Sequence, residues 1–243
     1  MKGWPTWLRV VRAFVVRVAC YGLALRIQLY AEARPAPTLP DAVLEWVPYV
    51  AWVDRYNYLL WLVAYVPLGL AFWWKDVERF IRYMETAGLI ALTRGVCIWL
   101  TGLGPVNGHD VNAGMTVAQQ NATFWKLLTL DFFSGDSPAH TYLTKDLFFS
   151  GHTATTFLLL LYVWPHRALR WPMLAAHVLV VVSVFFSHLH YTIDVIGAYA
   201  ITFCIFWLRE LRATGRPAAP RLPSARRTPS SLRRTRPPPA TPR

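Results

Sequence analysis

Residues 150–194 read SGHTATTFLLLLYVWPHRALRWPMLAAHVLVVVSVFFSHLHYTID, and this stretch decides the fold. It begins with the polar motif SGHT, continues through two apolar segments joined by a short basic loop, and ends on the polar motif HLHYTID at residues 188–194. Apolar segments of this length predict membrane-spanning helices. Polar groups at membrane depth are costly and mark function by default. The two motifs therefore predict two halves of one site, brought to the same end of a helix bundle by the loop between them.

Composition places the whole chain among membrane proteins. It has 243 residues, 55% of them hydrophobic, and the apolar residues come in long runs and not in alternating patterns. The net charge is +12, but ten of the 25 Lys and Arg residues lie between Arg209 and Arg243. A basic tail beside a hydrophobic segment indicates binding to anionic lipid headgroups, so no nucleic acid partner is expected. Cys20, Cys97 and Cys204 lie in apolar segments, which indicates small core residues and no disulfide or metal framework.

Several apolar segments are long enough to cross a bilayer, at roughly 20 residues per crossing. They are residues 10–30, 56–74, 84–103, 147–164, 171–187 and 191–208. The sequence thus predicts an all-α, polytopic membrane protein built as a six-transmembrane-helix bundle. The first segment contains Arg12, Arg17 and Arg26, which must snorkel or face the bundle. A cleaved signal peptide is the alternative, but the arginines interrupt the apolar core that such a peptide needs.

The connecting regions divide the chain into three parts. These are a cytoplasmic N-terminus with the first helix (1–32), a membrane domain (33–212) and a disordered basic tail rich in Pro and Arg (213–243). Four prolines between residues 33 and 55 predict a loop with one short interfacial helix at most. In the polar region 104–145, residues 124–133 could lie along the membrane interface.

Basic residues in the loops predict the orientation, because Lys and Arg accumulate on the cytoplasmic side. One side of the predicted bundle carries Lys75, Arg79, Arg82, Arg167, Arg170 and the tail. The opposite loops carry Arg34, Arg55, Lys126 and Lys145 among many acidic residues. Both termini are therefore expected in the cytoplasm, and both polar motifs are expected on the outer (exoplasmic or periplasmic) face.

The motif at residues 150–153 predicts an anion site at the start of a helix. Ser150 stands at the N-cap position, and Gly151 lets the backbone approach a ligand. His152 and Thr153 follow in the first turn. A helix start offers unpaired N–H groups and the positive end of the dipole, which both favour phosphate. The alternative is a capping box with an interfacial histidine and no ligand.

His190 and Asp194 are four residues apart, so on a helix that begins near residue 189 they project from one face. The carboxylate can then accept a hydrogen bond from one imidazole nitrogen. This fixes the tautomer and leaves the other nitrogen as a nucleophile or base. A helix-capping aspartate that is hydrated at the interface is the alternative.

A metal site is a competing interpretation of the same residues. His188, His190 and Asp194 could be ligands, with His109 and His140 as further candidates, and a hydrolytic site needs three ligands plus an open position. The sequence contains no helical HExxH spacing. We therefore expect a metal-independent histidine mechanism without a cofactor.

Arg94 lies in the middle of the apolar segment 84–103. A buried guanidinium needs an anionic partner, and a phosphate held by two hydrogen bonds would be one. Pairing with Asp194 or Glu85 is the alternative. A cation and a helix start for the phosphate, one oriented histidine as nucleophile and a second histidine as proton donor together predict phosphoryl chemistry.

Residues 149–153 (FSGHT) and 188–195 (HLHYTIDV), followed by 198–202 (AYAIT), resemble the two hallmark motifs of the sphingomyelin synthase family. This family is a branch of the type 2 phosphatidic acid phosphatase (PAP2) superfamily. Weaker matches follow the first and third apolar segments, at residues 37–41 (PTLPD) and 100–105 (LTGLGP).

Across residues 37–208 the resemblance implies a six-helix membrane transferase. Such an enzyme moves a phosphocholine- or phosphoethanolamine-type headgroup from a glycerophospholipid to ceramide, diacylglycerol or a similar lipid hydroxyl. The resemblance implies that His190 is the nucleophile, Asp194 its partner, and His152 the acid and later the base. The candidate substrate- and phosphate-binding residues are Arg94, Ser150, Gly151, Thr153 and Tyr191.

Two departures from the family pattern leave alternatives open. Residues 102–105 read GLGP where the family tends to have Leu-Pro, and the Lys and Arg-Pro phosphate motif of other superfamily phosphatases is absent. The alternatives are a lipid phosphate phosphatase or phospholipase C-like hydrolase, and a non-catalytic lipid-binding membrane protein. The identity of the headgroup and of the acceptor, and the oligomeric state, are left open.

Overall fold

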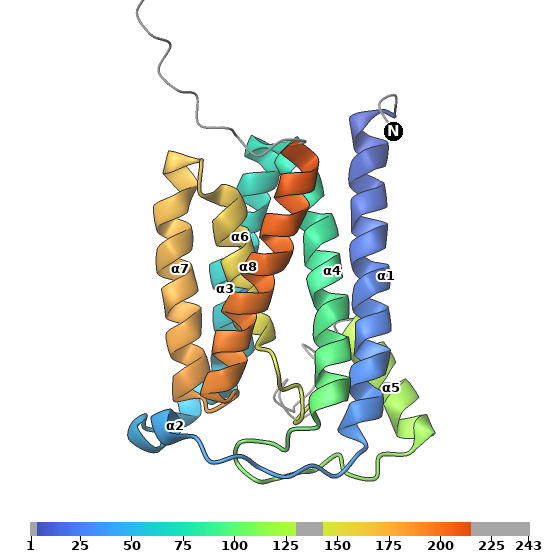
Figure 1. Cartoon of the computed structure of the whole chain (residues 1–243), viewed down its shortest axis with the longest axis vertical. Helices are drawn as coiled ribbons and strands as arrows, with labels where there is room; N and C mark the ends of the chain where they lie inside the picture. The colour runs from blue at the N-terminus through green and yellow to red at the C-terminus, as the bar shows by residue number, and fades with distance from the viewer. Residues whose placement is uncertain (1–3, 130–142, 215–243) are drawn as a thin grey trace, which may run out of the picture.

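The computed structural model of the chain describes residues 4–129 and 143–214, and over these residues it consists of helices and loops without a β-strand (Figure 1). The helices are α1 (Thr6–Glu32), α2 (Ala42–Trp46), α3 (Ala51–Lys75), α4 (Val77–Thr101), α5 (Val117–Leu128), α6 (Gly151–Val163), α7 (Arg167–Phe186) and α8 (Thr192–Thr214). The predicted all-α class is confirmed. The predicted tail, from residue 215 on, lies outside the described residues, as does His140.

Three helices are long and apolar enough to cross a membrane: α3, α7 and residues 192–210 of α8. The apolar helix α6 has 13 residues and is shorter than a crossing needs. Its predicted segment began at residue 147, whereas the helix begins at Gly151, because the Ser150 side chain caps it. The chain is therefore a helical membrane protein. That it crosses the membrane six times stays a prediction.

Helices α1 and α4 are less apolar because they carry matched charges. Arg9 forms a bidentate ion pair with Glu78 at 2.7 and 2.6 Å, and Arg12 pairs with Glu85. Arg17 donates to the carbonyl oxygen of Ala87 at 3.0 Å. Arg12 and Arg17 thus face α4, whereas Arg26 donates to Asn121 and lies over the ring of Phe124, both in α5. These contacts remove much of the cost of placing arginines at membrane depth.

Small residues let α1 and α4 approach closely, and this is the most extensive helix contact in the described structure. A Cβ atom on Gly95 would lie 2.9 Å from the Cα of Ala24, and one on Gly88 would lie 3.4 Å from the Cβ of Cys20. Only glycine fits at Gly95 without a shift of the backbone. Such small-residue contacts are a common way of packing helices in membranes.

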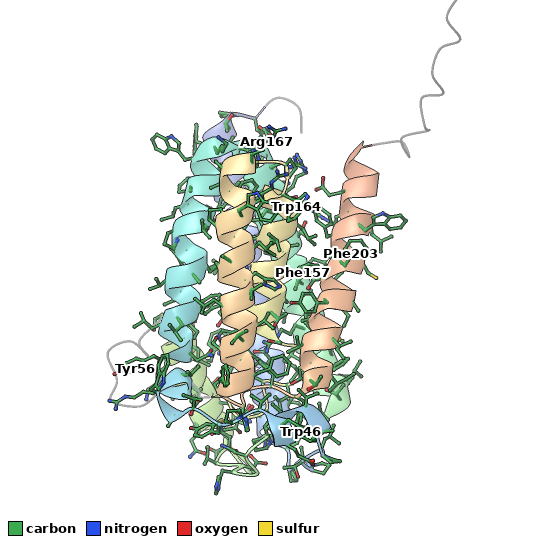
Figure 2. The ribbon with its side chains drawn as sticks, turned by 90° about the vertical axis from the view of Figure 1, so that its left-hand side faces the viewer. Trp46, Tyr56, Phe157, Trp164, Arg167 and Phe203 are labelled. Carbon is green, nitrogen blue, oxygen red and sulfur yellow. The ribbon has the colours of Figure 1, made fainter. Side chains whose placement is uncertain are left out.

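The outer surface of the bundle suits a bilayer. Large apolar side chains such as Val15 and Val63 are mostly exposed, at 60% and 65%. In Figure 2, Trp46 lies near one end of the bundle and Trp164 near the other, where aromatic side chains anchor a membrane protein at both interfaces.

Connectivity brings the two polar motifs together. Helix α1 begins and α8 ends at the same end of the bundle, whereas α6 and α8 both begin at the opposite end (Figure 1). Helix α6 packs on both α7 and α8. The loop between α6 and α7 therefore returns the chain to the end where α6 began, as the sequence predicts.

Candidate active site

The centre of the candidate site is a hydrogen-bonded histidine–aspartate pair at the start of α8. Nδ1–H of His190 donates to Oδ2 of Asp194 at 3.1 Å. The His190 residue is 4% exposed and Asp194 is fully buried. The backbone N–H groups of Tyr191 and Phe148 also donate to the carboxylate, at 3.1 and 3.0 Å. The carboxylate thus holds His190 in one tautomer, with a lone pair on Nε2.

His152 lies across from this pair in the first turn of α6. The ring centroids of His152 and His190 are 6.4 Å apart. Trp61 and Tyr58 contact the His152 ring edge-on, with centroids at 5.6 and 6.2 Å. Nε2 of His152 is buried and has no hydrogen-bond partner among the described residues. A buried polar atom without a partner is costly, so it marks a position where a ligand can bind.

Backbone contacts join the two helix starts directly. The Ser150 N–H donates to the carbonyl oxygen of Asp194 at 3.1 Å, and the Ser150 hydroxyl accepts from the Thr153 N–H at 3.3 Å as the N-cap. Thr153 is fully buried behind this cap. The structure therefore brings Ser150 and Thr153 to the site as parts of its framework.

His152 and His190 both line a cavity of about 150 Å³. Helix α3 supplies Asp54, Arg55, Asn57 and Tyr58 to its wall, α1 supplies Tyr21, and the segment before α6 supplies Asp146. The sequence analysis predicted none of these residues as part of the site; it used Arg55 only as a loop charge in the argument on membrane orientation. They lie on elements far apart in the chain, and no motif marks them.

Arg94 lies behind the start of α6, with its donors directed at the protein. Nε–H donates to the carbonyl oxygen of Phe149 at 2.5 Å, and Nη2–H donates to the carbonyl oxygen of Asp146 at 2.9 Å. Nη1 forms an ion pair with the Asp146 carboxylate at 2.7 Å. A Cβ on Gly151 would lie 3.1 Å from the Arg94 guanidinium carbon, so glycine permits this close contact. The ionic partner of Arg94 is therefore Asp146. The sequence analysis had considered Asp194 and Glu85 for this role.

Those two acids have other partners. Glu85 pairs with Arg12 and, at 3.0 Å, with Arg209, and Asp194 holds His190. Asp146 stands only four residues before Ser150, and this closeness to the motif could have marked it as a candidate site residue, although not as the partner of Arg94.

Tyr191 acts as a connector between three segments. Its hydroxyl donates to the carbonyl oxygen of Gly104 at 3.0 Å and accepts from the Leu39 N–H at 3.0 Å. The Gly104 N–H donates to the carbonyl oxygen of Pro37 at 2.8 Å. A Cβ at Gly104 would lie 2.4 Å from a backbone oxygen of residue 36, so this position requires glycine. The two weaker sequence matches thus lie side by side, next to the His190 motif.

A buried carboxylate positions the segment that leads into α6. Glu32 is 1% exposed and accepts hydrogen bonds from the backbone N–H and hydroxyl of Thr144, the N–H of Lys145 and the amide of Asn112. Nζ of Lys145 in turn pairs with Asp110 at 2.7 Å. These contacts place Thr144 and Asp146 in the cavity wall.

His188 points away from the cavity. Its Nε2 lies 2.9 Å from the carbonyl oxygen of Val47, and its ring meets Tyr49 edge-on. Within residues 4–129 and 143–214, no group of three or more His, Cys, Asp or Glu side chains is arranged to hold a metal ion.

These features define a helical membrane protein with an oriented histidine–aspartate pair and a second histidine across one cavity. The model of the PAP2 superfamily matches residues 41–208, so the chain belongs to this superfamily. The predicted resemblance is thereby confirmed.

Curated relatives agree with this assignment. The chain is 27% identical over 220 residues to human phosphatidylcholine:ceramide cholinephosphotransferase 1, covering 83% of this chain and 52% of that protein. It is 29% identical over 180 residues to human phosphatidylcholine:ceramide cholinephosphotransferase 2, covering 69% and 48%. The chain thus spans about half the length of these relatives.

Proposed function

We propose that this protein transfers a phosphocholine-type headgroup from a glycerophospholipid to ceramide or a similar lipid hydroxyl, with His190 as nucleophile. The observation that carries the proposal is the His190–Asp194 pair, which faces His152 across a cavity. The names of the two human relatives specify phosphatidylcholine and ceramide as their substrates. They support the choice of donor and acceptor.

In the first step, Nε2 of His190 attacks the phosphorus of the donor. The N–P bond forms as the P–O bond to the diacylglycerol oxygen breaks, and His152 gives its proton to that leaving oxygen. The imidazole carrying the phosphoryl group becomes cationic while Nδ1–H remains bonded to Asp194. The carboxylate stabilises this charge, as it does in other oriented His–Asp pairs.

In the second step, His152 takes the proton from the acceptor hydroxyl, whose oxygen attacks phosphorus. The N–P bond breaks and His190 returns to its starting state. Water at the acceptor position would instead release the free headgroup phosphate, so the same residues support hydrolysis. Exclusion of water decides between the two outcomes.

Four further predicted site residues would support the reaction by shaping the site and not by taking part in the chemistry: Ser150, Gly151, Thr153 and Tyr191. Ser150 and Thr153 build the start of α6, Gly151 leaves room for Arg94, and Tyr191 anchors the His190 loop. The phosphate contact expected of Arg94 stays a prediction, since its donors reach Asp146 and Phe149 in the structure.

We further propose that both termini are cytoplasmic and the site faces the outer leaflet. Arg167 lies at the end of the bundle opposite Trp46 (Figure 2), the end where α8 ends (Figure 1). Excess Lys and Arg favours the cytoplasmic side. The basic tail would bind anionic lipid there, and residues 33–212 would form the catalytic membrane domain.

The test is to incubate the purified protein in vesicles with headgroup-labelled phosphatidylcholine, with and without ceramide. Transfer predicts label in a sphingolipid only when ceramide is present. Label that appears only as free phosphocholine would replace transfer by hydrolysis. If the label stays in the donor and wild type behaves like His190→Ala, the protein binds lipid without turning it over. His188→Ala is the matched control, because His188 shares the motif but not the cavity.

A further inference from the structure

The proposed reaction requires a cation beside the phosphate. A phosphodiester anion placed between His152 and His190 would lie near the carboxylates of Asp54 and Asp146, which line the same cavity. Charge on the phosphoryl oxygens must be balanced in the transition state, and phosphoryl-transfer sites use Arg, Lys or a metal ion for this. Which cation of this chain does so is the question.

Arg94 is poorly placed for this task. It is 9% exposed, and it is absent from the lining of the cavity, whereas its partner Asp146 is part of that lining. Its ion pair and its two hydrogen bonds to backbone carbonyls already use Nε and both Nη atoms. These contacts use three of its five N–H groups. Because Arg94 does not line the cavity, it could reach a phosphate there only by moving away from the bonds that hold the segment leading into α6.

Arg55 has the opposite properties. It stands in the second turn of α3 and is the only Lys or Arg among the described residues that line the cavity. It is an exposed residue. Among the described residues its guanidinium makes no hydrogen bond or ion pair, and its charge rests 5.7 Å from the ring centroid of Tyr56. Its donors are therefore available, and its side chain can swing without breaking a bond.

We propose that Arg55 binds the phosphate of the donor lipid at the mouth of the cavity, while Arg94 is a positioning residue that shapes the start of α6. This inference rests on the proposed function and adds the phosphate ligand to it. Arg55 would approach from α3, across from the histidines of α6 and α8. A planar guanidinium offers two parallel donors to two phosphate oxygens, whereas lysine offers a point charge.

The kinetic test compares Arg55→Gln, Arg55→Lys and Arg34→Gln in the vesicle assay. We expect Arg55→Gln to lower kcat/KM for the donor by about 10²- to 10³-fold, the usual loss for one transition-state donor. Arg55→Lys should have a kcat/KM about 10-fold higher than Arg55→Gln, because lysine restores the positive charge but not the two parallel N–H donors. Arg34→Gln removes one positive charge from a residue outside the cavity and should stay near wild type.

A binding test separates this inference from the proposed function. In the His190→Ala protein, which cannot form the N–P bond, calorimetry should detect phosphocholine binding that weakens at least about 10-fold when Arg55→Gln is added. This result with no turnover by wild type would keep the phosphate site and reject transfer. Turnover by wild type with an unchanged Arg55→Gln variant would reject Arg55 and keep transfer.

Discussion

Two buried histidines, His190 and His177, have the same exposure of 4% and opposite surroundings. His190 has one ring nitrogen on Asp194 and lines the cavity with the rest of its ring. His177, in α7, has both ring nitrogens bonded, to Thr156 of α6 and to Tyr199 of α8, each at 2.8 Å. Burial therefore does not distinguish the proposed nucleophile from a histidine whose two ring nitrogens are both bonded within the protein; the distinguishing feature is that His190 lines a cavity and His177 does not.

The direction of the hydrogen bonds around His177 can be worked out. The Thr156 hydroxyl donates to the carbonyl oxygen of His152 at 2.8 Å, so it accepts from Nδ1–H of His177. Nε2 of His177 then accepts from the Tyr199 hydroxyl. Both ring nitrogens of His177 are thus used, and this series of hydrogen bonds ends on the backbone carbonyl oxygen of His152. His177 can thus affect the site through position only.

The largest effect that this comparison predicts is on His190. His190→Ala should lower headgroup transfer by at least about 10⁴-fold, because the proposed nucleophile is lost. Label transfer in vesicles measures it, and a thermal unfolding curve checks that the variant folds. Substantial transfer by a folded variant would remove the proposed mechanism.

Asp194→Asn should cost about 10²- to 10⁴-fold in turnover. The amide cannot stabilise the cationic phosphorylated imidazole, and if its NH₂ group faces His190, Nδ1 must accept and the proton moves to Nε2. The measurement is single-turnover transfer from labelled donor at saturating lipid. The first step should slow, with the KM for donor nearly unchanged. A change confined to KM would mean that Asp194 serves binding and not the nucleophile.

His177 provides the structural half of the comparison. His177→Phe should reduce turnover by less than about 10-fold and destabilise the protein by about 1–3 kcal/mol, because Thr156 and Tyr199 lose their partner. The midpoint of thermal unfolding should fall accordingly. Compared with His177→Phe, His177→Gln should recover part of the stability, because its side-chain amide can still hydrogen-bond to Thr156 or Tyr199. If turnover fell as far as in His190→Ala, His177 would also be needed for the reaction, and the assignment of a purely structural role to it would be wrong.

The sequence predicted the features that depend on local pattern. The Ser150 cap sets the start of α6, and the predicted contact between His190 and Asp194 is present. The helix that was expected to begin near residue 189 begins at Thr192, so His190 lies before α8 and only Asp194 lies in its first turn. The apolar runs correctly predicted an all-helical protein, and the motifs correctly predicted the family. Each of these follows from residues close together in the chain.

Features that depend on tertiary contacts could not be predicted in the same way. The partner of Arg94 was unknown because Asp146 lies 52 residues further along the chain, in a segment that Glu32 positions. The contributions of Tyr21 and Tyr58 to the cavity depend on how α1 and α3 pack, and apolar periodicity does not specify which polar residue faces inward. The charge pairs between α1 and α4 are also tertiary contacts. Their charged residues lower the hydropathy of the two helices, although the helices pack closely within the bundle.

The smallest predicted effect concerns Asp41, which supports the His190 loop from outside the helices. Its carboxylate accepts from the N–H and hydroxyl of Thr192, at 2.5 and 2.9 Å, and from the N–H groups of Val43 and Leu44. Burial alone would raise the pKa of Asp41, but these hydrogen bonds outweigh it and lower the pKa from its ordinary value of 3.8.

A carboxyl group with a lowered pKa stabilises the folded protein fully at pH values above 3.8 and loses this effect as the pH falls through its folded pKa. The difference in unfolding midpoint between wild type and Asp41→Asn should therefore be constant near neutral pH and shrink in acid. The difference isolates Asp41 from other acidic groups. Since Asp41 touches Thr192 and not the histidines, turnover at neutral pH should change less than in any variant of His190 or Asp194. A difference that grew as the pH fell would mean that the Asp41–Thr192 contact does not stabilise the loop through the charged carboxylate.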